Sequence, residues 1–75
     1  MHHDPDADAL YIRLSDLPCA FGEDIDHERR IDYAANGEPM GIEILGVSDG
    51  IDTHGLPHES AISRLAKEHA FKVFA

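Results

Sequence analysis

The chain has 75 residues, a length that favours a single domain with a small hydrophobic core. Six basic and fifteen acidic residues give a formal net charge of −9, which disfavours binding to nucleic acid or to an anionic membrane surface. No apolar run approaches the roughly 20 residues that a membrane-spanning helix needs, and the N-terminus does not resemble a signal peptide. The single cysteine, Cys19, has no partner in the chain, which predicts a reducing, cytoplasmic location.

The charge is distributed unevenly along the chain. Residues 1–60 contain three arginines and fourteen acidic residues, whereas residues 61–75 contain three basic residues and one glutamate. The acidic excess over residues 1–60 favours solubility or a basic partner.

The N-terminal segment predicts a turn that leads into a strand. Asp4 offers a carboxylate to the backbone N–H groups that follow it, and Pro5 suits the second position of a type I turn. From about Ala9 onward, apolar and polar residues alternate with the period of a half-buried strand, which ends before Pro18. Residues 1–3 are too few for a full strand, so the first strand is a stub or the native chain starts upstream.

The middle of the chain predicts further strands and one clear hairpin. A strand is expected at 20–25, followed by a bend at 26–28. Alternating residues then flank Asn36-Gly37, a pair that readily adopts the positive φ of short hairpin loops, which predicts paired strands near 29–34 and 39–45. Ile31 and Tyr33 are expected to point inward.

The C-terminal part predicts a loop over 47–56 and a helix over about 57–70, because Pro57 suits a first helical turn. One helical face carries residues at three- and four-residue spacing, namely Ile62, Leu65, Ala66, His69 and Ala70. Residues 71–74 are either a short strand or the end of the helix. The predicted fold class is α+β: a small antiparallel β-meander of about four strands, then one C-terminal helix packed on the sheet.

Three ordered motifs are similar to a known family. The motifs that carry the resemblance are Asp4-Pro5-Asp6-Ala7-Asp8-Ala9-Leu10-Tyr11-Ile12-Arg13-Leu14, then Ile31-Asp32-Tyr33, then Met40-Gly41-Ile42-Glu43-Ile44-Leu45. The chain resembles the bacterial domain-of-unknown-function family 2283 over about residues 4–46. The resemblance implies an antiparallel β-meander without an assigned activity, so no functional residue is transferred. The chain departs from the family pattern at His3, where a tyrosine is usual, and at Arg29 and Arg30, where apolar residues are usual. Its leading strand is also shortened.

Two patterns could indicate a metal site. Asp4-x-Asp6-x-Asp8 resembles the start of a calcium loop, but Ala9 and Ser15 stand where such a loop needs a glycine and an acid. The chain has six histidines: His2, His3, His27, His54, His58 and His69. His54 and His58 are four residues apart, but Gly55 and Pro57 lie between them. A continuous helix that would place both imidazoles on one face is therefore disfavoured. The sequence therefore predicts no metal ligand and no cofactor.

No pattern indicates nucleophilic catalysis. Cys19 has no basic neighbour and is expected to be a small buried apolar residue, while the serines lie outside any Gly-x-Ser-x-Gly motif; they are Ser15, Ser48, Ser60 and Ser63. Glu43 lies between two isoleucines and is expected to face solvent. We therefore predict no catalytic residue.

The expected function is that of a non-enzymatic protein-interaction module. Tyr11, Leu45 and Val47 are expected on the sheet face opposite the isoleucines, where a second copy could cover them, which favours a homodimer; a small basic protein is an alternative partner. The competing interpretation is a small-ligand or metal-binding domain, or an unrecognised enzyme. A pocket lined by histidines and a carboxylate would support that interpretation.

Overall fold

The structure is a computed structural model that describes residues 1–74, and these residues form two compact units. The first unit, Met1–Leu45, is a sheet of five strands: β1 (His2–Asp4), β2 (Ala9–Arg13), β3 (Phe21–Asp24), β4 (Arg29–Tyr33) and β5 (Pro39–Leu45). The second unit begins at Gly46 and contains a short 3₁₀ helix, η1 (Val47–Asp49), and one α-helix, α1 (Glu59–Glu68). The α+β class is confirmed.

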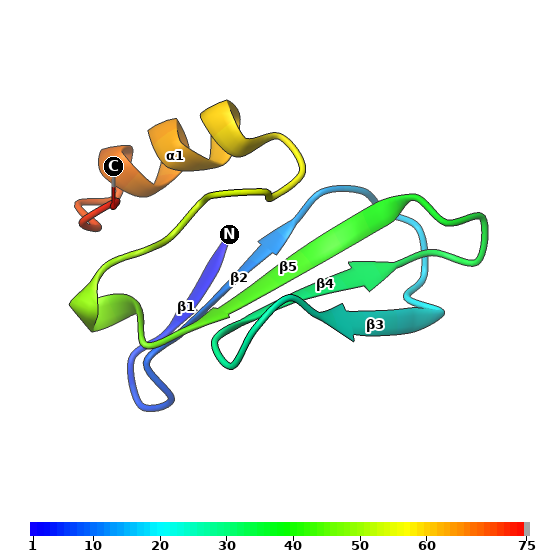
Figure 1. Ribbon diagram of the computed structural model, residues 1–75, viewed down its shortest axis with the longest axis horizontal. Coiled ribbons are helices and arrows are strands. Elements are labelled where there is room, and N and C mark those ends of the chain that lie inside the picture. The colour runs from blue at the N-terminus through cyan, green and yellow to red at the C-terminus, as the bar shows by residue number, and fades with distance from the viewer. Residues whose placement is uncertain (75) are drawn as a thin grey trace. The chain divides into compact units, whose positions relative to one another are not determined.

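The strand order of the sheet is β1-β2-β5-β4-β3, and every pairing is antiparallel (Figure 1). The N-terminal stub forms a fifth strand, since His2–Asp4 pairs with the start of β2. The chain thus combines a β1–β2 hairpin with a β3-β4-β5 meander, and β5 joins them at the centre.

One face of the sheet, the inner face, carries the apolar core. Leu10 of β2 stands opposite Ile44 of β5, and Ile42 stands opposite both Ile12 and Ile31. All five side chains are buried, with Leu10 and Ile42 fully inaccessible. The alternation read from the sequence therefore orients these strands correctly, because consecutive strand residues face opposite sides.

The turn between β1 and β2 is built around Asp4. Its Oδ1 accepts hydrogen bonds from the backbone N–H groups of Asp6, at 3.0 Å, and Ala7, at 3.3 Å. Asp8 then takes a left-handed conformation with φ of 51° before β2 begins. The acidic repeat thus forms the expected turn, and one of its carboxylate oxygens is engaged with the backbone.

The hairpin between β4 and β5 forms where the sequence predicts it. The N–H of Ala34 donates to the carbonyl of Glu38 at 2.8 Å, and the N–H of Gly37 donates to the carbonyl of Ala34 at 2.9 Å. The Asn36 side chain accepts from the Glu38 N–H at 3.0 Å. Gly37 has a φ of 87°, a value that β-branched residues resist.

Replacing Gly37 with valine should lower the free energy of unfolding by about 1–2 kcal/mol. Nothing lies within 4 Å of a Cβ built at this position, so the loss comes from backbone strain alone. Urea denaturation followed by circular dichroism measures it. Asparagine at position 37, which tolerates positive φ, should lose clearly less, and an equal loss for both variants would contradict the explanation.

The second unit contains more regular structure than the loop and helix that the sequence predicts. The predicted loop over 47–56 contains η1, and both Val47 and Ile51 are buried. Val47 was expected on the outer sheet face, and that prediction is wrong: the strand ends at Leu45 and Val47 starts η1. Within residues 71–74, only Val73 makes a strand-like bridge, with Ile51. Neither helix among residues 1–74 is long and apolar enough to span a membrane.

The helix α1 ends two residues earlier than predicted, at Glu68. Ala70 takes a left-handed conformation, with φ of 64°, and its N–H donates to the Lys67 carbonyl at 3.0 Å, while the N–H of Phe71 donates to the Ala66 carbonyl at 2.9 Å. These two bonds form a Schellman motif. Ile62 and Ala66 are buried as predicted, but His69 and Ala70 lie beyond the helix and are exposed.

Replacing Ala70 with glycine should raise the free energy of unfolding by about 1 kcal/mol, because a left-handed conformation costs alanine more than glycine. The same urea measurement detects the gain. Glycine at the neighbouring exposed position His69, which has φ of −93°, should give no gain. Equal effects at the two positions would show that the cap geometry is not the cause.

Candidate functional site

An apolar hollow of about 280 Å³ lies in the first unit beside the start of β3. The chain that leads into β3 and the turn after β4 line it, with Leu17, Pro18, Cys19, Ala20, Ala34 and Ala35. The adjacent Phe21 is 49% exposed and stacks on Tyr33, with ring centroids 5.2 Å apart. Exposed aromatic area next to an apolar hollow is a feature of binding surfaces.

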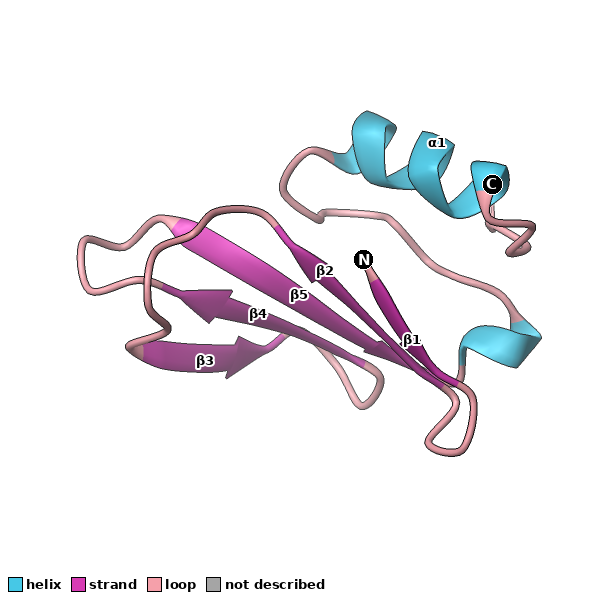
Figure 2. Ribbon diagram, turned by 180° about the vertical axis from the view of Figure 1, so that it is seen from behind, coloured by secondary structure: helices cyan, strands magenta, loops and turns pink. Residues whose placement is uncertain are grey.

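The strand β3 occupies one end of the sheet order, so one of its edges has no neighbouring strand among residues 1–74 (Figures 1 and 2). Past Phe21 this edge strand is acidic, with Glu23 and Asp24 both exposed. Asp24 lies 3.8 Å from the Arg30 guanidinium, whereas Glu23 has no ion-pair partner within the described chain. We call the exposed side of Phe21–Asp24 the β3 edge. It is apolar at Phe21 and negatively charged at Glu23 and Asp24.

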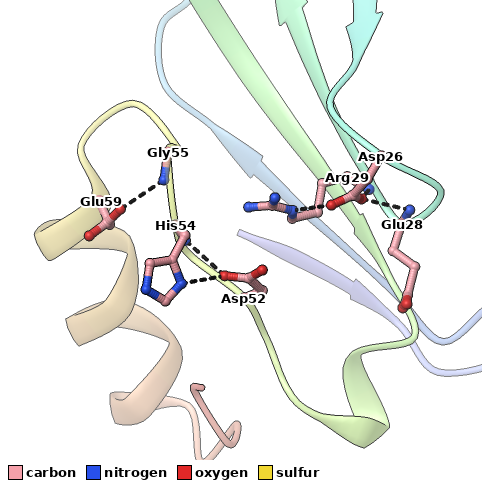
Figure 3. A network of polar contacts seen from close by, with 7 residues as sticks. All are labelled: Asp26, Glu28, Arg29, Asp52, His54, Gly55 and Glu59. Carbon is pink, nitrogen blue, oxygen red and sulfur yellow. Dashed lines mark hydrogen bonds and ion pairs between the residues drawn. The ribbon is translucent and has the colours of Figure 1, made fainter. Parts of the chain in front are cut away.

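The turn after β3 continues the acidic surface. Asp26 Oδ1 accepts hydrogen bonds from the N–H groups of Glu28 and Arg29, each at 2.9 Å, and its Oδ2 pairs with the Arg29 Nε at 2.9 Å (Figure 3). The bond from the Glu28 N–H, followed by the contact with the Arg29 side chain, lowers the pKa of Asp26. Asp26 therefore stays ionised beside β3 at neutral pH.

The outer face of the sheet carries a polar network. The Tyr11 hydroxyl donates to Asp32 at 3.2 Å, and the other Asp32 oxygen accepts from the Arg30 Nε at 3.1 Å. Burial of the ring, together with the charge of Asp32, raises the pKa of Tyr11, so its hydroxyl remains protonated. Glu43 is exposed on this face, as predicted. This network places polar groups on the outer face, where Leu45 is nevertheless exposed, as the sequence predicts.

Cys19 was expected to be buried, and that prediction is wrong: it is a free, exposed cysteine. It lies in the irregular segment between β2 and β3, with its thiol 3.7 Å from the Phe21 carbonyl. Residues in such a segment are placed by contacts distant in sequence, so apolar character alone does not determine burial.

The second unit holds an aspartate–histidine pair. His54 Nδ1 lies 2.7 Å from Asp52 Oδ1, which also accepts the His54 backbone N–H at 3.0 Å (Figure 3). Their side chains are 64% and 44% exposed, so solvent weakens the pair. His58 stands at the start of α1 in a left-handed conformation, apart from the helical face that a two-histidine site would need.

Comparison with known families identifies the first unit. The family model described as "Protein of unknown function (DUF2283)" matches residues 1–48, more than half of the chain. The chain belongs to the DUF2283 family. No match was found among curated proteins or solved structures.

The DUF2283 match spans the whole first unit and ends within η1. The hollow, the β3 edge and the Tyr11 network therefore all lie in the DUF2283 region. Sequence reasoning missed the hollow because its lining comes from two segments that the sheet brings together. The one local signal in the sequence was an aromatic residue, Phe21, close to the acidic Glu23 and Asp24.

Removing metal ions should leave the melting temperature unchanged, as the lack of a ligand set in the sequence predicts. Among residues 1–74, no group of three metal-binding side chains gathers at one point, in the DUF2283 region or after it. Thermal melts with and without EDTA measure this. A drop of several degrees that zinc or nickel restores would contradict the prediction.

Proposed function

We propose that the chain is a non-enzymatic protein-interaction module of the bacterial cytoplasm, and that the β3 edge with its apolar hollow is the docking site. The observation that supports this proposal is an unpaired strand edge with a half-exposed aromatic ring beside a hollow. An extended segment that adds to such an edge gains main-chain hydrogen bonds, while a hollow selects one of its side chains.

The charge of this surface favours a basic occupant. The β3 edge carries Glu23 and Asp24, and the turn that follows adds Asp26 and Glu28; the pairing arginines compensate only part of this charge. The partner we propose is an extended segment of a basic protein, with one apolar side chain in the hollow and lysine or arginine against Glu23.

A peptide titration tests the proposal. The probe is a fluorescein-labelled decapeptide of alternating lysine and valine, measured by fluorescence anisotropy at physiological salt, with an alternating glutamate–valine peptide as its counterpart. We expect binding of the lysine peptide alone, together with slower amide hydrogen exchange over residues 21–24. Equal binding of both peptides, or unchanged exchange in β3, would overturn the proposal.

Matched variants separate the docking site from bulk electrostatics. Glu23→Lys should weaken binding by about tenfold or more, since it replaces an attraction by a repulsion. Asp6→Lys makes the same change in net charge on the exposed β1–β2 turn and should leave affinity within about twofold. Ala35→Asp places a charge in the hollow and should also weaken binding. An equal loss for Asp6→Lys and Glu23→Lys would show that the peptide senses only net charge.

A second copy of the chain is the second candidate partner. The exposed large apolar side chains of the first unit favour self-association; they are Met1, Leu17, Phe21, Ile25 and Leu45. Antiparallel pairing of two β3 strands, however, would bring Glu23 and Asp24 close to the same residues of the other copy, so like charges oppose it. Sedimentation equilibrium at micromolar concentration decides this: a dimer mass supports self-association, and a mass near 8.3 kDa throughout removes it.

A further inference from the structure

The second unit contains a hollow of about 560 Å³ along one side of α1. Ser60, Ser63, Arg64 and Lys67 line it from the helix, at the three- and four-residue spacing that places side chains on one helical face. This face is distinct from the buried one, which carries Ile62 and Ala66. The volume lies in the range of small-molecule sites, roughly 300–1,000 Å³.

The hollow is basic in an otherwise acidic chain. Arg64 and Lys67 are exposed and have no ion-pair partner within the described residues, and His54 lines the opposite wall. The one carboxylate in the lining belongs to Glu59, and it accepts the Gly55 N–H at 2.9 Å (Figure 3). Two unpaired cations beside hydroxyl groups form a surface that suits an anion with several acceptor oxygens.

An aromatic ring completes the lining. Phe74 is 44% exposed and contributes to the hollow, and the Lys72 Nζ lies 5.4 Å from the centre of its ring. Lys72 therefore adds a third cation beside the hollow. Thr53, which is 5% exposed, also lines the hollow. An inorganic anion would leave Phe74 unused, whereas an organic phosphate would contact both the cations and the ring.

We propose that this basic hollow binds a small phosphomonoester. Arg64 and Lys67 pair with the phosphate oxygens, Ser60 and Ser63 donate hydroxyl hydrogen bonds to them, and Phe74 contacts the organic part. The site belongs to the second unit, and the proposal does not depend on the docking edge of β3. It also lies outside the family match, which ends at residue 48.

Nuclear magnetic resonance titration of the full chain tests the proposal, with phenyl phosphate as the probe and inorganic phosphate and phenol as its two halves. We expect saturable shifts of the amides of residues 60–67, with tighter binding of phenyl phosphate than of either half. An absence of saturable shifts there, or equal shifts with phenol, would overturn it.

Charge variants provide the control. The double variant Arg64→Gln and Lys67→Gln should lose about tenfold or more in affinity, since hydrogen bonds to charged groups are among the strongest. Arg64→Gln alone and Arg13→Gln alone each remove one positive charge. Arg64→Gln should weaken binding, whereas Arg13→Gln, in the first unit, should stay within about twofold. A similar loss for Arg13→Gln would mean that only net charge attracts the probe.

A separate experiment distinguishes a lipid headgroup from a soluble molecule as the source of the phosphomonoester. Vesicles of phosphatidylcholine with phosphatidic acid carry the same chemical group at a surface. Co-sedimentation that the double variant abolishes would assign the site to a lipid headgroup. Binding of phenyl phosphate without co-sedimentation would assign it to a soluble ligand, as the net charge of −9 favours.

Discussion

Replacing Ile42 with alanine should lower the free energy of unfolding by about 2–5 kcal/mol, the largest effect that we expect from one substitution. Ile42 is fully buried on β5, the central strand, and stands opposite Ile12 of β2 and Ile31 of β4. Alanine at this position removes contacts to both neighbouring strands and leaves a cavity where the two halves of the sheet meet. Urea denaturation followed by circular dichroism measures the loss.

Two variants calibrate this experiment. Ile42→Val removes a single methylene and should cost about 0.5–1.5 kcal/mol. Glu43→Ala changes the next residue, which is exposed on the outer face, and should stay within about 0.5 kcal/mol. A loss below that of the valine variant for Ile42→Ala would contradict the central position of β5.

Replacing Gly50 with alanine should lower the free energy of unfolding by about 1–3 kcal/mol. Gly50 follows η1 with φ of 124° and ψ of 165°, a region of the backbone map that only glycine occupies readily. A Cβ built there would also lie 2.6 Å from the Phe74 ring. Both backbone strain and displacement of Phe74 therefore oppose the substitution.

A double-mutant cycle separates these two causes. In a Phe74→Ala background the ring is absent, so the remaining cost of Gly50→Ala reports the backbone alone. A cost that is unchanged in that background would show that the ring moves aside freely. An undetectable cost in both backgrounds would contradict the conformation of Gly50.

The same two substitutions test the number of cooperative domains. Ile42 lies in the first unit and Gly50 in the second. The chain length predicts one domain, and we therefore expect both variants to shift a single unfolding transition. Two transitions, each shifted by one variant, would show that the units unfold separately.

The candidate docking site was only partly visible in the sequence. The excess of acidic residues over positions 1–60 is plain in the sequence and led to the expectation of a basic partner, but it did not single out positions 23, 24, 26 and 28. The hollow was not visible, because Leu17 and Ala35 are distant in sequence and are brought together only when β3 pairs with β4. Charge is a property of composition, whereas a concave surface depends on which segments pair.

The sequence alone determined the features that rest on local chemistry. The turn at Asp4, the tip at Gly37 and the alternation along β2, β4 and β5 depend on neighbouring residues, and all of them form as predicted. Tertiary structure decided the rest. The insertion of β5 between β2 and β4, the burial of Val47 and Ile51, and the exposure of Cys19 follow from contacts between residues far apart in the chain. Local propensity determines where a helix or strand forms. Which elements pack against each other depends on how much apolar surface the whole chain can bury.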